Sequence, residues 1–181
     1  MRSLGPGPMV LALAFALGAP GLLDAQTARP GFEVFGSVGV GVGVGGGEFA
    51  SQGFGDGRAA GPSAGGGIGM RPFLSTNDSF LSGLGFEFEV NAVRPLLAAS
   101  HADTYMTGSI LAHFGNDRIE AFGLLGAGKR FVPGRDDQIL QLGAGAKVFL
   151  TRSVSVRPEI RLVPEFGPTT WRLSTGLGYR W

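Results

Sequence analysis

Apolar and polar residues alternate with a period of two along most of the chain after Phe32. Successive side chains of a β-strand point to opposite sides of the sheet, so this pattern predicts strands with one apolar face and one polar or small face. No stretch has the three- and four-residue apolar spacing of an amphipathic helix over several turns. The chain is therefore expected to be all-β. The predicted strands cover residues 32–44, 63–74, 80–94, 103–114, 118–131, 138–150, 154–166 and 171–181.

The alternation is clearest in the third predicted strand, where Phe86 and Phe88 oppose Glu87 and Glu89. The last strand shows it too, with Trp171 and other large apolar residues on one face and small or charged residues on the other. The phase of the fifth strand, 118–131, cannot be fixed, because its Phe-Gly-Leu-Leu-Gly-Ala-Gly centre does not alternate.

The predicted connections alternate between longer loops and short turns. The longer ones cover 45–62, 95–102 and 132–136, and the short ones 75–79, 115–117 and 151–153. An even number of strands joined in this way predicts an eight-stranded, antiparallel, up-and-down barrel with both termini on the short-turn, periplasmic side. Aromatic residues are expected near both rims, as in the girdles of membrane barrels. They are Phe32, Phe80, Phe114, Tyr179 and Trp181 at the periplasmic rim, and Phe131 and Trp171 at the outer rim.

Two barrel types fit a period of two: a transmembrane barrel, and a soluble lipocalin-like barrel with an apolar cavity. The glycines distinguish them, because in the first, second, third, sixth and eighth strands they share the polar face. A face exposed to water gains nothing from glycine, which weakens a strand. Inside a small barrel, glycine makes room for long side chains and eases tight curvature. The sequence therefore favours a transmembrane barrel with an apolar exterior and a charged interior.

The N-terminal segment is expected to be a cleaved signal peptide, residues 1–25, followed by a barrel domain, residues 26–181. Arg2 precedes an apolar run from Met9 to Leu17, and small residues lead to an expected cut after Ala25. Bulky Leu23 leaves the cleavage site open by a few residues. The run is too short, and too interrupted by glycine and proline, to favour an uncleaved membrane anchor.

The composition excludes several classes of function. Charged residues make up only 16% of the chain and its net charge is +1, so nucleic acid is not an expected partner. There is no cysteine, which excludes disulfides and thiol catalysis. His101 has no second histidine or acidic cluster beside it, and no metal or other cofactor is expected.

Charged residues on the polar faces are the main candidate site. An eight-stranded barrel is only wide enough for its own side chains to fill it. We predict that residues of both signs form an ion-paired plug across the lumen. A lumen that is merely solvated, or a narrow pore, are the alternatives. The residues are Glu87, Glu89, Lys147, Arg157, Glu159 and Arg161.

Lipid A modification is the enzymatic alternative, and it requires a histidine beside a hydroxyl nucleophile. The segment from His113 to Asn116 faintly resembles the His-x-Ser-Asn of the lipid A deacylases, but Gly115 stands where the serine would be. His113 is also expected on the inner face near the periplasmic end, away from the outer leaflet. No catalytic residue is therefore predicted.

The chain from about Phe32 to Trp181 resembles the OmpA-like family of small outer-membrane β-barrels. The segment 155–161, Ser-Val-Arg-Pro-Glu-Ile-Arg, is similar to the family's penultimate strand. The closing Leu177, Tyr179 and Trp181 resemble its signal for the barrel-assembly machinery, with Trp in place of the commoner Phe. The resemblance implies a monomer in the bacterial outer membrane, in contact with lipid and lipopolysaccharide, with a structural or surface-interaction role. The loop 45–62 could make surface contacts, although its composition favours a spacer.

Overall fold

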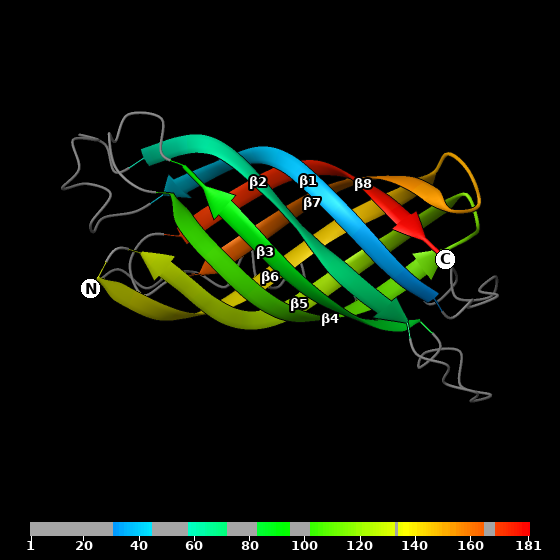
Figure 1. Ribbon diagram of the computed structural model, residues 1–181, viewed down its shortest axis with the longest axis horizontal. Coiled ribbons are helices and arrows are strands. Elements are labelled where there is room, and N and C mark those ends of the chain that lie inside the picture. Colours follow the sequence, from blue (N-terminus) through cyan, green and yellow to red (C-terminus); the bar gives the residue numbers. More distant parts are fainter. Residues whose placement is uncertain (1–30, 45–57, 72–82, 95–101, 133, 165–168) are drawn as a thin grey trace, which may run out of the picture.

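The computed structural model describes residues 31–44, 58–71, 83–94, 102–132, 134–164 and 169–181. These residues form eight strands that close into one barrel (Figure 1). No helix among them is long and apolar enough to cross a membrane. The strands are β1 Gly31–Val44, β2 Arg58–Arg71, β3 Leu84–Val93, β4 Asp103–Gly115, β5 Ile119–Val132, β6 Arg135–Phe149, β7 Val154–Pro164 and β8 Thr169–Arg180. The predicted all-β, eight-stranded antiparallel barrel is confirmed.

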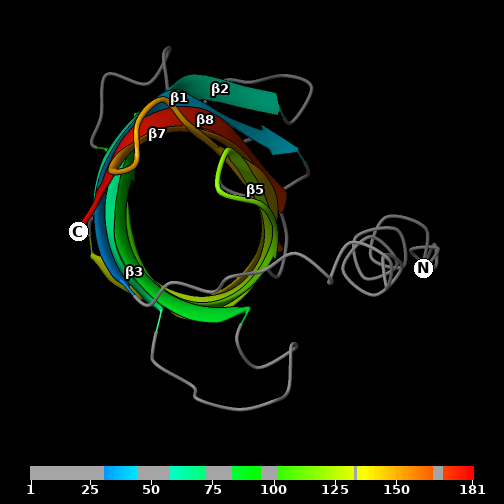
Figure 2. The same ribbon diagram turned by 90° about the vertical axis from the view of Figure 1, so that its right-hand side faces the viewer.

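The barrel closes by antiparallel pairing of β1 with β8. The register runs from Glu33↔Arg180 to Val44↔Thr169, and just beyond it the Trp181 N–H donates to the Phe32 carbonyl oxygen (3.3 Å). Every strand therefore has two neighbours, and the ring is continuous when seen end-on (Figure 2). Closure matters in a membrane because each unpaired backbone group in hydrocarbon costs several kcal/mol.

Two short turns lie where the sequence predicts them. Between β4 and β5, the Asn116 side-chain oxygen accepts hydrogen bonds from the N–H groups of Arg118 (2.9 Å) and Ile119 (3.0 Å). Between β6 and β7, the Thr151 hydroxyl accepts a bond from the Val154 N–H (3.0 Å). Gly115 enters the first turn with φ of 126°, which a residue with a side chain rarely adopts. At both turns these side-chain bonds add to backbone hydrogen bonds, which join the Asn116 N–H to the Ile119 carbonyl (2.9 Å) and the Leu150 N–H to the Val154 carbonyl (2.9 Å).

The expected start of the second strand is wrong. β2 begins at Arg58 instead of residue 63, and Gly83 is a turn residue just before β3. The expected strand residues 72–74 and 80–82 lie outside the described residues. The early start was missed because Ala, Gly and Pro carry no apolar alternation. Pro62 is tolerated within β2 because it lies where the pairing with β3 ends, and its carbonyl accepts a bond from the Arg94 N–H (3.0 Å).

One expected connection length is wrong. The loop expected at 132–136 is reduced to residues 133–134, because Val132 still belongs to β5 and Arg135 begins β6. Gly134 in this connection has φ of 82°. The predicted loop 45–62 ends earlier than expected, since β2 begins at Arg58. The predicted short turn 75–79 lies outside the described residues, as do residues 45–57.

The two faces of the sheet have the predicted orientation. Large apolar side chains such as Phe86, Phe88 and Leu173 are exposed on the outside, while glutamate and arginine side chains are buried in the lumen. This arrangement is the reverse of a soluble barrel with an apolar cavity, and it matches a barrel surrounded by hydrocarbon. The structure also fixes the phase of β5: Phe122 and Leu124 point inward and Leu125 points outward.

The aromatic residues predicted for the rims lie near the ends of their strands where the structure describes them. Phe32, Tyr179 and Trp181 gather at the end of the barrel that carries the C-terminus, with ring centroids of Trp181 6.2 Å from Phe32 and 6.1 Å from Tyr179. Phe114 is the next-to-last residue of β4 on that side. At the opposite end, Phe131 is the next-to-last residue of β5 and Trp171 the third residue of β8. Phe80 lies outside the described residues.

Candidate functional site

Charged side chains fill the centre of the lumen with an ion-pair network, here called the central network. It consists of Glu87 and Glu89 from β3, Arg157, Glu159 and Arg161 from β7, and Arg172 from β8. In a ring of eight strands β3 and β7 lie opposite each other. Ion pairs between them therefore cross the full width of the barrel.

Arg161 is the hub of the central network. Its Nη2 lies 2.7 Å from Glu87 Oε1, its Nη1 2.7 Å from Glu89 Oε2, and its Nε 3.0 Å from Glu159 Oε1. The side chain is fully buried, with 0% of its surface exposed. A guanidinium carries five donors in a planar fork, so a single arginine can bind three carboxylates in this way.

The other two arginines complete the charge balance. Arg157 Nη2 lies 2.6 Å from Glu87 Oε2, and Arg172 Nη2 donates to both oxygens of Glu89 at 2.7 Å. The Ser174 hydroxyl donates a further bond to Glu159 (3.0 Å). Three arginines therefore face three glutamates with no excess charge. Buried charges are tolerated only when they are paired and hydrogen-bonded in this way.

Two aromatic rings enclose the Arg157 guanidinium. Its Cζ lies 4.2 Å from the ring centroid of Phe35 and 4.5 Å from that of Phe122, within the range of cation–π contacts. Both rings lie over glycine backbone: a Cβ at Gly67 would come within 2.7 Å of Phe35 Cζ, and one at Gly145 within 2.5 Å of Phe122 Cζ. The lack of a Cβ at these two inward-facing glycines thus leaves the space that the two rings occupy.

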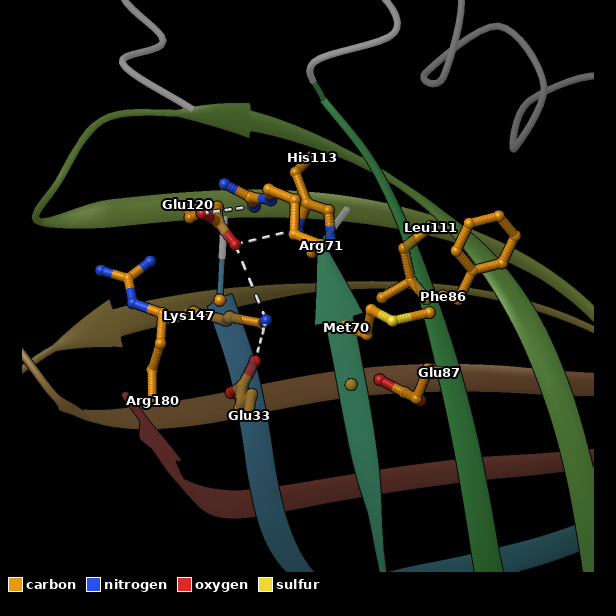
Figure 3. Close-up of a pocket in the computed structure, with 12 residues that line it drawn as sticks. Glu33, Met70, Arg71, Phe86, Glu87, Leu111, His113, Glu120, Lys147 and Arg180 are labelled. Carbon is orange, nitrogen blue, oxygen red and sulfur yellow. Dashed lines mark hydrogen bonds and ion pairs between the residues drawn. The ribbon is translucent and has the colours of Figure 1, made fainter. Parts of the chain in front are cut away.

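A second group of charges lies at the end of the barrel where β1 begins and β8 ends. It is here called the terminal cluster (Figure 3). Glu120 binds Arg71 through Oε2 (2.7 Å) and the His113 Nδ1 through Oε1 (2.8 Å), and Lys147 Nζ is 3.7 Å from Oε1. Lys147 also pairs with Glu33. The cavity between them measures only about 30 Å³, which is room for one or two water molecules.

The far end of the lumen is narrowed by an apolar group. Tyr105, Ile139 and Val163 pack together with Val93. Beside them Arg130 pairs with Asp103 (2.7 Å) and lies 6.0 Å from the Tyr105 ring centroid. The terminal cluster, the central network and this apolar group therefore lie one after another along the lumen.

The structure brings five of the six predicted lumen residues together. Lys147 is the exception, because it belongs to the terminal cluster and makes its pairs with Glu33 and Glu120. Sequence reasoning left Arg172, Glu33 and Glu120 out of the site. Arg172 and Glu33 are in phase with the polar faces of their strands and could have been included. Glu120 was hidden by the unresolved phase of the fifth strand.

The closing residues Leu177, Tyr179 and Trp181 all face outward on β8 or just beyond it, and all are at least half exposed. This places them against lipid at the rim of the barrel. Their role as a signal for the assembly machinery stays a prediction.

His113 is the histidine that the described residues include. His113 is buried in the lumen within the terminal cluster, and its ring centroid is 6.1 Å from that of Phe122. His101 lies outside the described residues. Among the residues that the structure describes, no three His, Cys, Asp or Glu side chains are grouped so that they could hold a metal ion.

Comparison with known proteins identifies the fold. No family model matches the chain, and no curated protein matches it. Neisserial surface protein A matches with a TM-score of 0.55 and 16% identity, over 83% of this chain and 97% of that one. The N-terminal β-barrel domain of Pseudomonas aeruginosa OprF matches with a TM-score of 0.54 and 14% identity, over 84% and 100%. A designed transmembrane β-barrel gives 0.53 and 11%, over 84% and 98%.

The natural neighbours are small outer-membrane barrels, and the predicted fold class and outer-membrane location agree with them. At these identities the likeness concerns the fold alone. It does not assign the chain to the OmpA-like family.

Proposed function

We propose that this chain is a barrel of the bacterial outer membrane whose lumen is closed by its own side chains, and that it acts as a structural or surface-interaction protein without catalysis. The central network is the observation that supports a closed lumen most strongly. Six buried charged side chains connect opposite walls of the barrel, and two aromatic rings enclose one of them.

Further support comes from what lies above and below that network. The terminal cluster leaves a cavity of only about 30 Å³ on one side, and the packed group of Tyr105, Ile139 and Val163 narrows the other. An ion crossing the lumen would have to separate salt bridges at both charged levels, whose partners would then be buried without a counter-charge. A closed barrel presents its outer surface and its loops for function, instead of a channel.

The proposed partners follow from this location. Outer-membrane lipid and lipopolysaccharide surround the apolar exterior, and the barrel-assembly machinery reads the closing strand during insertion. A monomer is the proposed state, and closure of the sheet supports it in one respect, since no strand edge remains for pairing with a second copy. An even number of strands puts the start of β1 and the end of β8 on one side of the membrane, and we propose that this side is the periplasmic one, as in known outer-membrane barrels.

Conductance in planar bilayers tests the closed lumen. The full chain, reconstituted at a protein density confirmed by a fluorescent label on the incorporated barrel, is expected to produce no current steps above those of protein-free bilayers. The double variant Arg157→Ser/Phe122→Ser removes the guanidinium and one of its enclosing rings, and is expected to raise the conductance. Steady, stepwise conductance by the unaltered protein would show that the lumen is a pore.

A further inference from the structure

The outer surface of the barrel contains an apolar hollow of about 850 Å³ that spans β1 to β6. Its floor lies where Gly108 of β4 pairs with Ala127 of β5. A Cβ at Gly108 would meet no atom within 4 Å, so the space above this glycine is open. Along the same row, Phe88 pairs with Gly108 on one side and Leu140 pairs with Ala127 on the other. Two small residues between two large ones thus make a recess in the surface.

The walls of the hollow are made of hydrocarbon side chains. One row of residues borders the recess toward the end of the barrel where β1 begins and β8 ends. These residues are paired in register across neighbouring strands: Met70, Phe86, Ile110 and Leu125. All four are exposed on the outside of the barrel. In a bilayer such a recess is filled by an acyl chain, because leaving it empty would forfeit the contacts of its lining atoms.

A single lysine lies next to this recess, toward the end of the barrel where β1 ends and β8 begins. Lys129 lies two residues beyond Ala127 on the same outward face of β5, and it is exposed. The register places it between Met106 of β4 and Gln138 of β6. Within the part of the chain that the structure describes, Lys129 forms no ion pair.

The depth of Lys129 suits a lipid headgroup. β5 ends at Val132, so the Cα of Lys129 lies roughly 10 Å along the strand from its far end. A lysine on the lipid face costs about 2–4 kcal/mol at the bilayer midplane but about 0–1 kcal/mol near the interface. Its flexible side chain can extend the ammonium toward the headgroups while its methylene groups remain against the apolar surface.

We propose that this recess and Lys129 together form a binding site for a phosphorylated lipid of the outer leaflet, of the lipid A type. One acyl chain occupies the recess over Gly108 and Ala127, and the Lys129 ammonium pairs with a phosphate, to which the Gln138 amide can donate a second bond. The site rests on the proposed function in one respect: the Lys129 end of the barrel faces outward only if the termini face the periplasm. A second copy of the chain is a poorer fit, since it would leave the lysine charge without a partner.

Two variants and two matched controls separate the parts of the site. Gly108→Leu adds a side chain to the recess at a position where its Cβ meets no atom within 4 Å. Ala144→Leu makes a similar change on the outer face of β6, away from the recess floor. Lys129→Gln removes the charge, and Arg152→Gln removes one from the exposed turn between β6 and β7. Folding of each variant is checked by its β-sheet circular dichroism before binding is measured.

The measurement is native mass spectrometry of the full chain in detergent with diphosphoryl lipid A as the probe, and with its dephosphorylated form. One lipid A per barrel is expected to be retained. Lys129→Gln should weaken retention about fivefold, the factor for about 1 kcal/mol per basic residue near an anionic lipid. Loss of the phosphates should weaken retention by the unaltered protein at least as much, and should have a smaller effect on Lys129→Gln, which keeps only the Gln138 bond. Gly108→Leu should weaken the retention of both lipid A forms, and the two control variants should leave the retention of both unchanged.

Equal retention by all four variants, or a preference for the dephosphorylated lipid, would overturn the site while leaving the closed barrel intact. Dimers that Gly108→Leu abolishes would assign the recess to a second copy and also overturn it. Failure of the proposed function is separate, because it appears as ion conductance by the unaltered protein.

Discussion

Replacing Arg161 with methionine is expected to lower the free energy of unfolding by about 3–5 kcal/mol, the cost of leaving a buried charge without its partner. Arg161 binds Glu87, Glu89 and Glu159 and is fully buried. Without it, three glutamates share the two remaining arginines, Arg157 and Arg172. One negative charge is then uncompensated in the middle of the barrel. Urea-induced unfolding in lipid vesicles, followed by tryptophan fluorescence, measures the loss.

The double variant Arg161→Met/Glu89→Gln is the test of the charge balance itself. It restores two charges of each sign, so it is expected to be more stable than Arg161→Met and more stable than Glu89→Ala alone. The pair of Arg130 and Asp103, which lies near the rim and is partly exposed, provides the control. Arg130→Met should lower the free energy of unfolding by less than Arg161→Met does. If Glu89→Ala alone left the free energy of unfolding unchanged, that result would contradict the central network described above.

Arginine substitutions on the outer face are expected to depend on depth. Leu125 and Leu150 are almost equally exposed, at 59% and 63% of their surface, but Leu125 lies near the middle of β5 and Leu150 follows the end of β6. In a bilayer, Leu125→Arg should cost about 2–4 kcal/mol and Leu150→Arg about 0–1 kcal/mol. The difference arises because only the first guanidinium is forced into hydrocarbon.

The same pair of variants distinguishes a membrane protein from a soluble one. On a water-exposed surface both substitutions are ordinary changes with effects within about 0.5 kcal/mol. The measurement is unfolding in lipid vesicles for each variant against the unaltered chain. Equal and small effects at both positions would mean that Leu125 does not face lipid.

The pattern of two-residue alternation was enough to predict the barrel, its strand number and the orientation of its faces. The strongest signal came from strands whose inward positions are charged or glycine, such as β3 with Glu87 and Glu89. Glycine on the polar face was informative for a physical reason visible in the structure. At Gly67 and Gly145 it makes room for the rings of Phe35 and Phe122.

The pattern failed where inward and outward residues have the same chemistry. In β5, inward Phe122 and Leu124 are as apolar as outward Leu125, because they pack with Leu111 into a small core inside the lumen. No rule based on polarity can assign such a strand. The start of β2 failed for the opposite reason, since Ala59, Ala60, Gly61 and Pro62 carry almost no side chain by which a face could be recognised.

The lumen site was predicted in part because membership in a network depends on height along the barrel as well as on facing inward. Lys147 faces inward as expected, yet it is level with Glu33 and Glu120 and pairs with them. Arg172 faces inward too, and it is level with Glu89. Height depends on the register between neighbouring strands, which the spacing of residues within one strand does not contain.

Collision accessibility of nitroxide labels tests the orientation of the faces most directly. The chain has no cysteine, so single cysteines at Ile110, Leu125 and Leu140 can each be labelled cleanly in protein reconstituted in bilayers. We expect all three labels to collide freely with oxygen, which concentrates in hydrocarbon, and poorly with a water-soluble nickel chelate, whereas a label at Leu150 should meet the chelate readily. Labels at Ile110, Leu125 and Leu140 that collide with the chelate as often as the label at Leu150 would contradict an apolar exterior embedded in lipid around a charged lumen.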